Sequence, residues 1–398
     1  LHVNLSNMGG PRELSAPFCL LPVSVDTEAE QVPIWGMTPR ERLEKQAGKL
    51  GLDVIGENDP ANLDKDSPVL IIRSDTVLES AILKALTTHS GSFCLIDQDS
   101  GQILGIWTKA EEAPGALKRL KSPGADTGGV PCLTPGDVAG AYNPVLRKKQ
   151  PPLASLLNSG NRRNLEWSLY RSAYKGVTDF VTKYIWPVPA FHVTRACAAL
   201  GFTPNAVTIF GAVLMVLATW LFSLGAFGWG LAAGWVMVFL DTVDGKLART
   251  TLTSSKWGEI LDHGIDLLHP PFWYAAWAWG LGAGALALGF NTIMILLFGF
   301  YIASRLLEGY FIQRFGMHMH VWRRWDSRFR EFMARRNPNL ALLTLFALAG
   351  QPSWGLYAVI IWQIVTFLLQ LLQIAQAEYG RARGREIRSW LDSETAER

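Results

Sequence analysis

The sequence predicts a soluble α/β domain followed by an α-helical polytopic membrane domain with six transmembrane helices. The chain has 398 residues, which is long enough for two domains of ordinary size. Its mean hydropathy of +0.15 averages two unlike halves. Residues 1–171 are polar, with charges and turn residues throughout, whereas residues 207–377 consist mainly of long apolar runs rich in Trp, Phe and Leu.

The polar half shows alternating strand and helix patterns. β-Branched and aromatic runs predict strands at Phe18–Val25, Asp53–Gly56, Val69–Ser74 and Ser92–Trp107. Thr38-Pro39-Arg40-Glu41 predicts a helix start, with Thr38 as N-cap and Glu41 completing a capping box. A second helix is expected over Thr76–Thr88. Alternating strands and helices predict an α/β domain with a mainly parallel sheet.

Composition argues against nucleic acid as a partner and for a cytosolic setting. The net charge is +3, from 37 basic and 34 acidic residues, which is too balanced for a nucleic-acid interface. The four cysteines have no metal-type spacing, so we expect reduced thiols. Nothing resembling a signal sequence precedes the polar half, so we expect the soluble domain to stay in the cytosol.

We expect four segments: a soluble domain at 1–122, a linker at 123–174, a membrane domain with a juxtamembrane helix at 175–377, and a basic tail at 378–398. The linker is suggested by the Gly- and Pro-rich stretch from Pro123 to Pro152.

Six apolar segments are candidates for crossing a bilayer, which takes about 20 residues. The fifth segment, Leu340–Ala349, has about ten apolar residues and crosses only if the preceding Phe329–Asn339 contributes. Pro270 and Pro271 interrupt the third segment, Leu267–Leu281, and are expected to break or kink its helix. The six segments are Ala206–Leu224, Phe227–Leu240, Leu267–Leu281, Leu286–Leu307, Leu340–Ala349 and Trp354–Ala377.

Loop charges predict the orientation. The connections near Gly225–Gly228, Gly282–Gly289 and Gly350–Ser353 are uncharged, whereas the alternate connections and the tail are rich in Lys and Arg. By the positive-inside rule both termini and the charged loops face the cytosol. An odd number of helices would break this alternation. We therefore expect a multi-pass protein of the cytoplasmic membrane with its active site on the cytosolic side.

The first charged loop carries two pairs of aspartates. The chain reads Asp241-Thr-Val-Asp244-Gly245-Lys-Leu-Ala248-Arg249 and, eight residues later, Gly258-Glu-Ile-Leu-Asp262-His-Gly-Ile-Asp266. On helices, spacings of three and four place each pair on one face. Acids at a membrane boundary are costly and usually mark a functional site. Oxygen ligands without His or Cys favour Mg²⁺ or Mn²⁺, and four acids suffice for two ions. The alternative is a set of surface salt bridges with Lys246 and Arg249.

This pattern, DxxDGxxAR followed after eight residues by GxxxDxxxD, resembles the motif of CDP-alcohol phosphotransferases, also called CDP-alcohol phosphatidyltransferases. Thr203-Pro204-Asn205-Ala-Val-Thr208 resembles the family's TPNxVT element. The stretch from Lys175 to Phe202 is similar to its juxtamembrane helix, so the resemblance covers about Lys175 to Ala377.

The resemblance implies a homodimeric membrane transferase in phospholipid or polyol-phosphodiester synthesis. It would move a substituted phosphate from a CDP-alcohol, such as CDP-diacylglycerol or CDP-inositol, to an acceptor hydroxyl and release CMP. Asp266 would be the general base. Two Mg²⁺ or Mn²⁺ ions would be bound by Asp241, Asp244, Asp262 and Asp266. The cytidine diphosphate would be bound by Asn205, Asp241, Gly245, Ala248, Arg249 and Gly258.

Basic residues between the fourth and fifth predicted spans suggest an acceptor site. Similar enzymes use basic residues here to receive a phosphate, so we expect Arg305, Arg335 and Arg336 to bind the acceptor or a phosphate. The alternative is that these arginines fix orientation and contact anionic lipids. The acceptor itself stays open; a phosphorylated polyol is favoured over inositol, serine or a lipid alcohol.

The soluble domain weakly resembles the nucleotidyltransferase part of bifunctional inositol-phosphate cytidylyltransferase/di-inositol-phosphate-phosphate synthases. Its first strand leads into Asp26-Thr-Glu-Ala-Glu-Gln, which would repel phosphate, instead of a Gly-rich, Arg-bearing turn. Asp75 lies where that fold often keeps a metal-binding acid. We therefore expect a degenerate domain. The alternative for the whole chain is an inactive membrane scaffold that binds partners through this domain, but a scaffold predicts a broken acid pattern.

Overall fold

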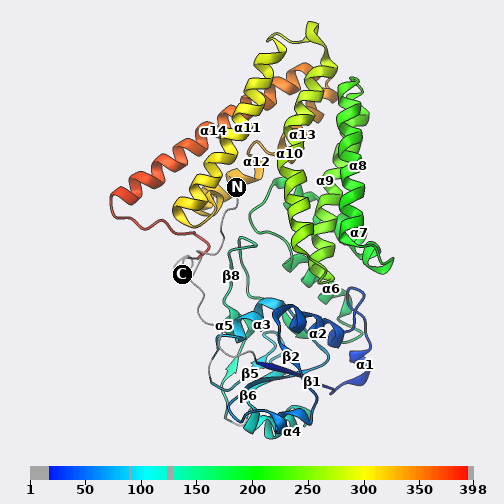
Figure 1. Cartoon of the computed structure of the whole chain (residues 1–398), viewed down its shortest axis with the longest axis vertical. Coiled ribbons are helices and arrows are strands. Elements are labelled where there is room, and N and C mark those ends of the chain that lie inside the picture. The colour runs from blue at the N-terminus through cyan, green and yellow to red at the C-terminus, as the bar shows by residue number, and fades with distance from the viewer. Residues whose placement is uncertain (1–17, 90, 123–126, 128, 393–398) are drawn as a thin grey trace. The chain divides into compact units, whose positions relative to one another are not determined.

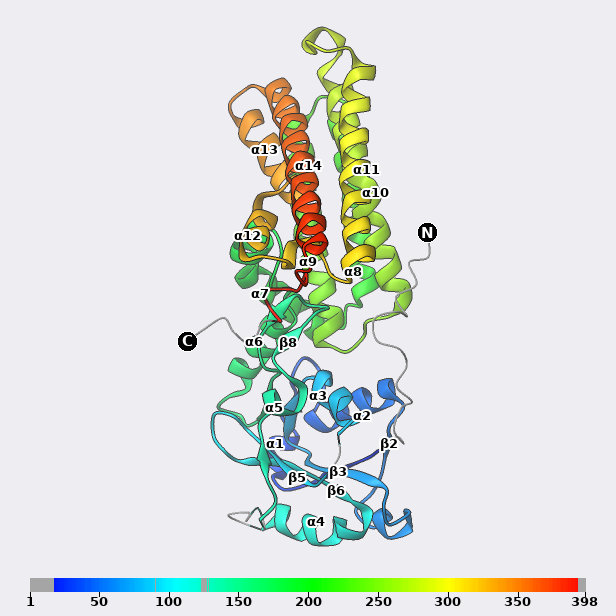
Figure 2. The ribbon, with the colours of Figure 1, turned by 90° about the vertical axis from the view of Figure 1, so that its left-hand side faces the viewer.

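The computed structural model describes residues 18–89, 91–122, 127 and 129–392, without the side chains of 256, 257, 259 and 261–263. Contacts divide the chain into two compact units. The α/β unit comprises residues 1–143, 149–174 and 250–252, and the helical unit comprises 144–148, 175–249 and 253–398. Figures 1 and 2 show the strands gathered in the first and the long helices in the second. Each unit is described by itself.

The α/β unit is built on a six-stranded sheet of order β2-β1-β3-β6-β5-β7. β1 runs parallel to β2 and β3, and β5 runs parallel to β7, but β6 is antiparallel to both β3 and β5. The prediction of a mainly parallel sheet is therefore confirmed: β6 runs against the other five strands of this sheet, which all share one direction. Its strands are β1 (Cys19–Val23), β2 (Asp53–Val54), β3 (Pro68–Arg73), β5 (Phe93–Ile96), β6 (Ile103–Lys109) and β7 (Cys132–Leu133).

The reversed strand arises within the run Ser92–Trp107, which forms two strands, β5 and β6. The chain reverses between β5 and β6, where the Asp97 carboxylate accepts a hydrogen bond from the Asp99 N–H at 2.9 Å. Gly101 completes the turn with a φ of 69°, a conformation that glycine adopts without strain. A tight hairpin joins antiparallel neighbours, so β6 enters the sheet between β5 and β3 in the reversed direction.

Helices cover both faces of the sheet (Figure 2). Along β3, Leu70 and Ile72 pack with α2 (Pro39–Leu50) and α3 (Ser80–Leu86), and Val69 and Ile71 pack with α4 (Ala113–Lys121). This alternation follows from the two-residue period of a strand. The apolar run Val69–Ile72 of β3 is thus explained by burial on both faces.

The helix predicted at Thr38 is confirmed, including its capping box. The Thr38 hydroxyl accepts from the Glu41 N–H, and the Glu41 carboxylate accepts from the Thr38 N–H. The helix predicted over Thr76–Thr88 is wrong in its first turn. There β4 (Thr76–Leu78) pairs with β10 (Ala154–Leu156), and α3 begins only at Ser80.

The segment 123–174, expected as a linker, carries secondary structure of its own. β7 belongs to the main sheet and β10 pairs with β4. The segment also contains α5 (Pro135–Ala139), β8 (Tyr142–Asn143), β9 (Lys148–Lys149) and α6 (Arg162–Ser172). Within it, residues 144–148 pack with the helical unit.

The helical unit contains a helix at each of the six predicted apolar segments. Three of them, α8, α11 and α14, are long and apolar enough to cross a membrane. A shorter helix, α7 (Pro187–Ala199), covers the expected juxtamembrane stretch, and α12 (Arg324–Phe332) lies in the basic loop. The six helices are α8 (Pro204–Ser223), α9 (Phe227–Thr250), α10 (Lys256–Leu281), α11 (Phe290–Phe315), α13 (Arg336–Leu348) and α14 (Pro352–Ala382).

All six helices contribute to one apolar core (Figure 1). Phe222 of α8 packs edge-on against Trp273 of α10, with ring centroids 5.9 Å apart. Close to it, Gly280 allows the two helices to touch, because a Cβ there would lie 1.9 Å from the Phe222 carbonyl oxygen. Other large apolar side chains of α8, including Ile209 and Trp220, are exposed, as expected of a surface that faces lipid.

α10 continues through Pro270 and Pro271, so the predicted break does not occur. Proline lacks an N–H, and Pro271 therefore leaves the carbonyl of Leu267 without its helical donor. The hydroxyl of Tyr301 on α11 donates to that carbonyl at 2.8 Å. A side chain from a neighbouring helix thus replaces the missing bond.

Candidate active site

Two of the predicted aspartates are joined by a single arginine. Asp241 lies on α9, Asp266 on α10 and Arg336 at the start of α13. Nη2 of Arg336 donates to Oδ2 of Asp241 at 2.5 Å, and Nη1 donates to Oδ1 of Asp266. One acid from each of the two helices therefore meets at this guanidinium. Arg336 was expected to bind the acceptor; here it neutralises part of the acid cluster.

Asp244 is held separately and is buried. Its Oδ2 accepts a hydrogen bond from the Thr208 hydroxyl of α8 at 2.6 Å. Its Oδ1 is buried and has no hydrogen-bond partner in the described part of the chain. An ionised carboxylate oxygen left in this state is costly. A small cavity lined by Asp241, Asp244, Thr208 and Ile265 lies beside it.

The fourth acid, Asp262, lies on α10 one turn before Asp266, but its side chain is outside the described residues. Among the side chains that the structure describes, no three His, Cys, Asp or Glu form a metal-binding group. The donor chemistry nevertheless fits a hard divalent ion. The unpartnered Oδ1 of Asp244 and the carboxylates beside it are oxygen ligands of the kind that Mg²⁺ and Mn²⁺ prefer.

The residues expected to contact cytidine diphosphate fall into two neighbourhoods. A Cβ added to Gly258 would lie 3.3 Å from Asn205 Oδ1, so the structure brings Asn205 and Gly258 together. A Cβ added to Gly245 would lie 3.1 Å from Nη2 of Arg249, one turn later on α9. Ala248 precedes Arg249 and is half-buried.

The remaining two predicted arginines share a different acid. Arg305 lies 3.1 Å from Oε1 of Glu308, Arg335 binds Oε2, and Gln370 donates to Oε1 at 3.1 Å. Arg305 and Arg335 thus form one group around Glu308, while the adjacent Arg336 contacts the aspartates. Glu308 was not among the predicted site residues, although its position three residues after Arg305 places both on one helix face.

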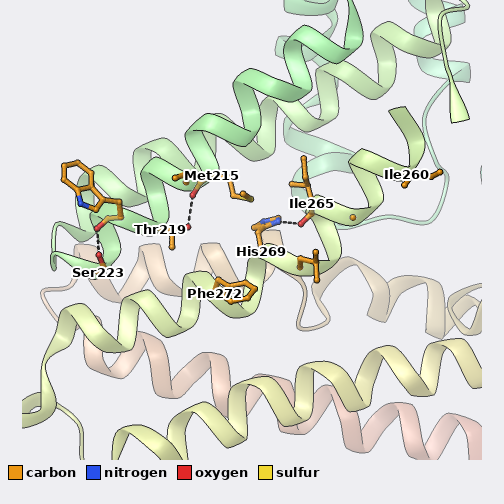
Figure 3. A pocket seen from close by; sticks show the side chains of 11 residues that line it. Met215, Thr219, Ser223, Ile260, Ile265, His269 and Phe272 are labelled. Atoms are coloured by element: carbon orange, nitrogen blue, oxygen red, sulfur yellow. Dashed lines mark hydrogen bonds between the residues drawn. The ribbon is translucent and has the colours of Figure 1, made fainter. Parts of the chain in front are cut away.

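An open apolar groove of about 730 Å³ lies between α8 and α10 (Figure 3). Its few polar side chains turn back to their own helices: Thr219 donates to the Met215 carbonyl, and the His269 ring contacts the Ile265 carbonyl. The surface left to the groove is therefore almost entirely apolar. Ile265 lines both this groove and the small cavity at Asp244.

Two acids of the α/β unit, Asp75 and Asp26, already accept hydrogen bonds from neighbouring groups. Asp75 is 2% exposed, and the guanidinium of Arg73 binds both of its oxygens, at 3.0 and 2.7 Å. Asp26 accepts from the N–H groups of Glu28 and Ala29, both at 3.1 Å, and so occupies the N-terminus of α1 (Thr27–Glu30). A phosphate at that helix end would be repelled by the Asp26 carboxylate, which already occupies the N–H groups that would bind it.

The helical unit is a bundle of apolar helices that holds paired carboxylates and a guanidinium. These features are typical of integral membrane proteins with an internal polar site. Residues 202–369 match the model of the CDP-alcohol phosphatidyltransferase family. This part of the chain is therefore similar to CDP-alcohol phosphatidyltransferases.

Curated relatives agree over part of the chain. A phosphatidylinositol phosphate synthase of Mycobacteroides abscessus is 38% identical over 94 residues, covering 22% of this chain and 43% of the relative. An archaetidylinositol phosphate synthase of Pyrococcus horikoshii is 40% identical over 83 residues, covering 20% and 43%. The chain therefore spans less than half the length of these relatives.

Two further proteins are more distant. A bifunctional IPC transferase and DIPP synthase of Rubrobacter xylanophilus is 31% identical over 157 residues, covering 39% of this chain and 33% of the relative. The crystal structure of the phosphatidylinositol phosphate synthase of Mycobacterium tuberculosis with CDP-DAG bound aligns with 46% of this chain and 92% of its own. That alignment has 19% identity and a TM-score of 0.36.

Proposed function

We propose that the chain is an integral membrane CDP-alcohol phosphotransferase that transfers a substituted phosphate from a CDP-alcohol to an acceptor hydroxyl and releases CMP. The observation that carries this proposal is the arrangement of three described aspartates from the family pattern. Asp241 and Asp266, from two helices, share one guanidinium, and Asp244 lies buried with an unpartnered oxygen.

Asp241, Asp244, Asp262 and Asp266 would hold two Mg²⁺ or Mn²⁺ ions, which stabilise charge on phosphate oxygens when bound. Asp266 would accept the proton of the acceptor hydroxyl, whose oxygen then bonds to phosphorus as the P–O bond to CMP breaks. Its side chain is 41% exposed, against 19% for Asp241, so an incoming hydroxyl reaches it more readily. Asn205, Gly245, Ala248, Arg249 and Gly258 would bind the cytidine diphosphate.

The groove between α8 and α10 favours a lipid donor such as CDP-diacylglycerol over CDP-inositol. Ile265 lines both the groove and the acid cavity, so an acyl chain in the groove would lie beside a diphosphate at the acids. For the acceptor, the arginine pair at Glu308 favours a phosphorylated polyol.

The remaining parts of the proposal concern the whole assembly. All six long helices would cross the cytoplasmic membrane with both termini in the cytosol, as the loop charges indicate. The α/β unit would be a degenerate nucleotidyltransferase-like domain, which the engagement of Asp26 and Asp75 supports. The membrane domain would form a homodimer, as the family resemblance implies.

The test is the variant Asp266→Asn, which keeps the shape of the side chain and removes its basicity. Loss of a general base costs about 10²- to 10⁴-fold. We expect CMP release by purified protein in lipid nanodiscs to fall by that factor while the unfolding temperature stays close to that of the parent protein.

The control is Glu386→Gln, which removes an exposed acid of the tail. It should release CMP at the parent rate. Unchanged turnover in Asp266→Asn would exclude Asp266 from the mechanism, and absence of CMP release from the parent protein across CDP-alcohols and acceptors would refute the proposed function.

A further inference from the structure

Arg336, which joins two of the aspartates, is also held by its neighbour Asn337. Nη1 and Nη2 of Arg336 donate to Asp266 and Asp241, and its Nε donates to Oδ1 of Asn337 at 3.3 Å. All three nitrogens of the guanidinium are therefore engaged, and the group is fixed between the two carboxylates. The Arg336 side chain is 15% exposed, so these contacts are largely shielded from water.

The amide of Asn337 is fixed in turn by residues that precede the part of the chain matching the family model. Its Nδ2 donates to Oδ1 of Asp179 at 2.9 Å and to the Thr182 hydroxyl at 3.2 Å. Asp179 lies just before the short helical turn Val181–Ile185 and also accepts from the Thr182 N–H at 3.0 Å. Asn337 and Asp179 are 4% and 7% exposed. A buried set of hydrogen bonds thus connects Asn337 to the juxtamembrane segment.

An asparagine suits this position for a chemical reason. A carboxylate only accepts hydrogen bonds, and a guanidinium only donates them. The amide of Asn337 offers its oxygen to Arg336 and its N–H groups to Asp179, so these two partners determine which end of the amide is oxygen. An aspartate here would repel Asp179, and a leucine would hydrogen-bond with neither group. Asn337 therefore connects the guanidinium to a carboxylate that does not belong to the acid site.

The position of Arg336 matters for ion binding, because this residue contacts two of the acids proposed to hold divalent ions. A guanidinium and a divalent ion are both cations, so they compete for the oxygens of Asp241 and Asp266. The apparent affinity for an ion falls with the fraction of molecules in which these acids are available. Contacts that keep Arg336 in place lower that fraction and so weaken ion binding.

We propose that Asp179 and Asn337 hold the guanidinium of Arg336 between Asp241 and Asp266 and thereby limit the affinity of the acid site for divalent ions. Both are positioning residues, because they act through Arg336 and touch neither the ion nor the substrate. The juxtamembrane segment, through Asp179, then determines how readily the acids accept an ion. This inference rests on the metal site of the proposed function.

The experiment uses the full chain in nanodiscs of neutral lipid. It measures Mn²⁺ binding from the EPR signal of the free ion, and the unfolding temperature in EDTA. Asn337→Leu keeps the approximate size of the side chain and removes its hydrogen bonds to Arg336 and Asp179. We expect it to bind Mn²⁺ about 3- to 10-fold more tightly than the parent protein, the equivalent of one ordinary hydrogen bond. Its unfolding temperature without ions should fall, because the acids lose part of their fixed counter-charge.

Asp179→Asn is a milder second variant. It keeps the shape of the side chain and one acceptor oxygen but removes the charge that attracts the Asn337 amide, so Mn²⁺ affinity should rise by a smaller factor. The matched control is Asn339→Leu, which removes another buried amide of α13. That amide donates to the Tyr274 hydroxyl at 2.8 Å. The control should unfold at a lower temperature but bind Mn²⁺ as the parent protein does.

A double-variant cycle separates this role from a general loss of structure. Arg336→Gln removes the competing charge and should itself bind Mn²⁺ more tightly than the parent protein. In the Arg336→Gln background, Asn337→Leu should change Mn²⁺ affinity no further, since there is no guanidinium left to hold. A gain of equal size in both backgrounds would overturn the inference.

Unchanged or weaker Mn²⁺ binding by folded Asn337→Leu would also overturn it. Weaker binding would show that Arg336 orients the acids for the ion and does not compete with it. Absence of Mn²⁺ binding by the parent protein would instead refute the metal site of the proposed function, and this inference with it. An Asn337→Leu protein that does not fold leaves the decision to Asp179→Asn, whose parent-like Mn²⁺ affinity would equally contradict the role.

Discussion

At the scale of single residues, the three described aspartates differ in what holds them. Asp241 and Asp266 share the guanidinium of Arg336, whereas Asp244 is fixed by the hydroxyl of Thr208. The same hydroxyl also lies 3.1 Å from the Pro204 carbonyl of its own helix, so two acceptors share its single proton, and the contact with Asp244 is the shorter one at 2.6 Å. Thr208 therefore links the start of α8 to the acid site.

Thr208→Val is the first prediction at this scale. Valine keeps the shape but removes the hydrogen bond that orients Asp244. Partners of this kind typically contribute about 10- to 100-fold to metal affinity or activity. We expect the Mg²⁺ concentration for half-maximal CMP release to rise within that range. Thr208→Ser, which retains the hydroxyl, should stay within a few-fold of the parent, and equal Mg²⁺ dependence in all three proteins would exclude this role.

The aspartates could be predicted because their spacing is local. Offsets of three and four residues place acids on one helix face whatever the tertiary fold. The partner of Asp241 could not be found in this way, since Arg336 lies 95 residues away. Arg336 was assigned to the acceptor with Arg305 and Arg335, because enzymes that this chain resembles use basic residues in this part of the chain to receive a phosphate. The start of α13 turns their side chains to different acids.

At the scale of elements, α10 shows why a local rule can fail. Two consecutive prolines predict a break, and an isolated helix would have no replacement donor for the Leu267 carbonyl. Within the bundle, the Tyr301 hydroxyl of α11 supplies that donor. The turn between β5 and β6 depends only on nearby residues. It is nevertheless hard to locate from the sequence, because the run Ser92–Trp107 around it is β-prone throughout.

Tyr301→Phe tests this account of α10. The variant leaves a buried carbonyl unsatisfied, which costs about 1–3 kcal/mol. We expect a lower unfolding temperature in detergent. In a Pro271→Ala background the helix regains its own N–H, so the same substitution should cost markedly less. Equal costs in the two backgrounds would show that the hydroxyl does not replace the missing helical bond.

At the scale of the whole molecule, hydropathy located six helices of the helical unit: α8, α9, α10, α11, the short α13 and α14. Three of them are apolar and long enough to be recognised individually as membrane spans. The others carry charged residues or are short, which lowers their hydropathy, so the charges of the loops were needed to predict that they cross the membrane. The secondary structure within 123–174 could not be predicted for a similar reason, because the short strands β7 and β10 are stabilised by pairing with strands distant in the sequence.

Single cysteines in a background without the four native ones test the six-span topology. Gly284→Cys lies in an uncharged connection and Ser254→Cys in a charged one, and both positions are exposed. A membrane-impermeant maleimide should label Gly284→Cys in intact spheroplasts, and Ser254→Cys only after permeabilisation. Labelling of both from the same side would rule out crossing by α10 in the proposed orientation.

Arg336 also has a consequence for how the chain matures. Its guanidinium leaves the trio of Asp241, Asp266 and Arg336 with one net negative charge in place of two. A nascent bundle can therefore assemble around these acids without waiting for an ion to arrive from the cytoplasm. Biogenesis in magnesium-starved cells should accordingly yield inserted, assembled protein that needs only the ion to begin turnover.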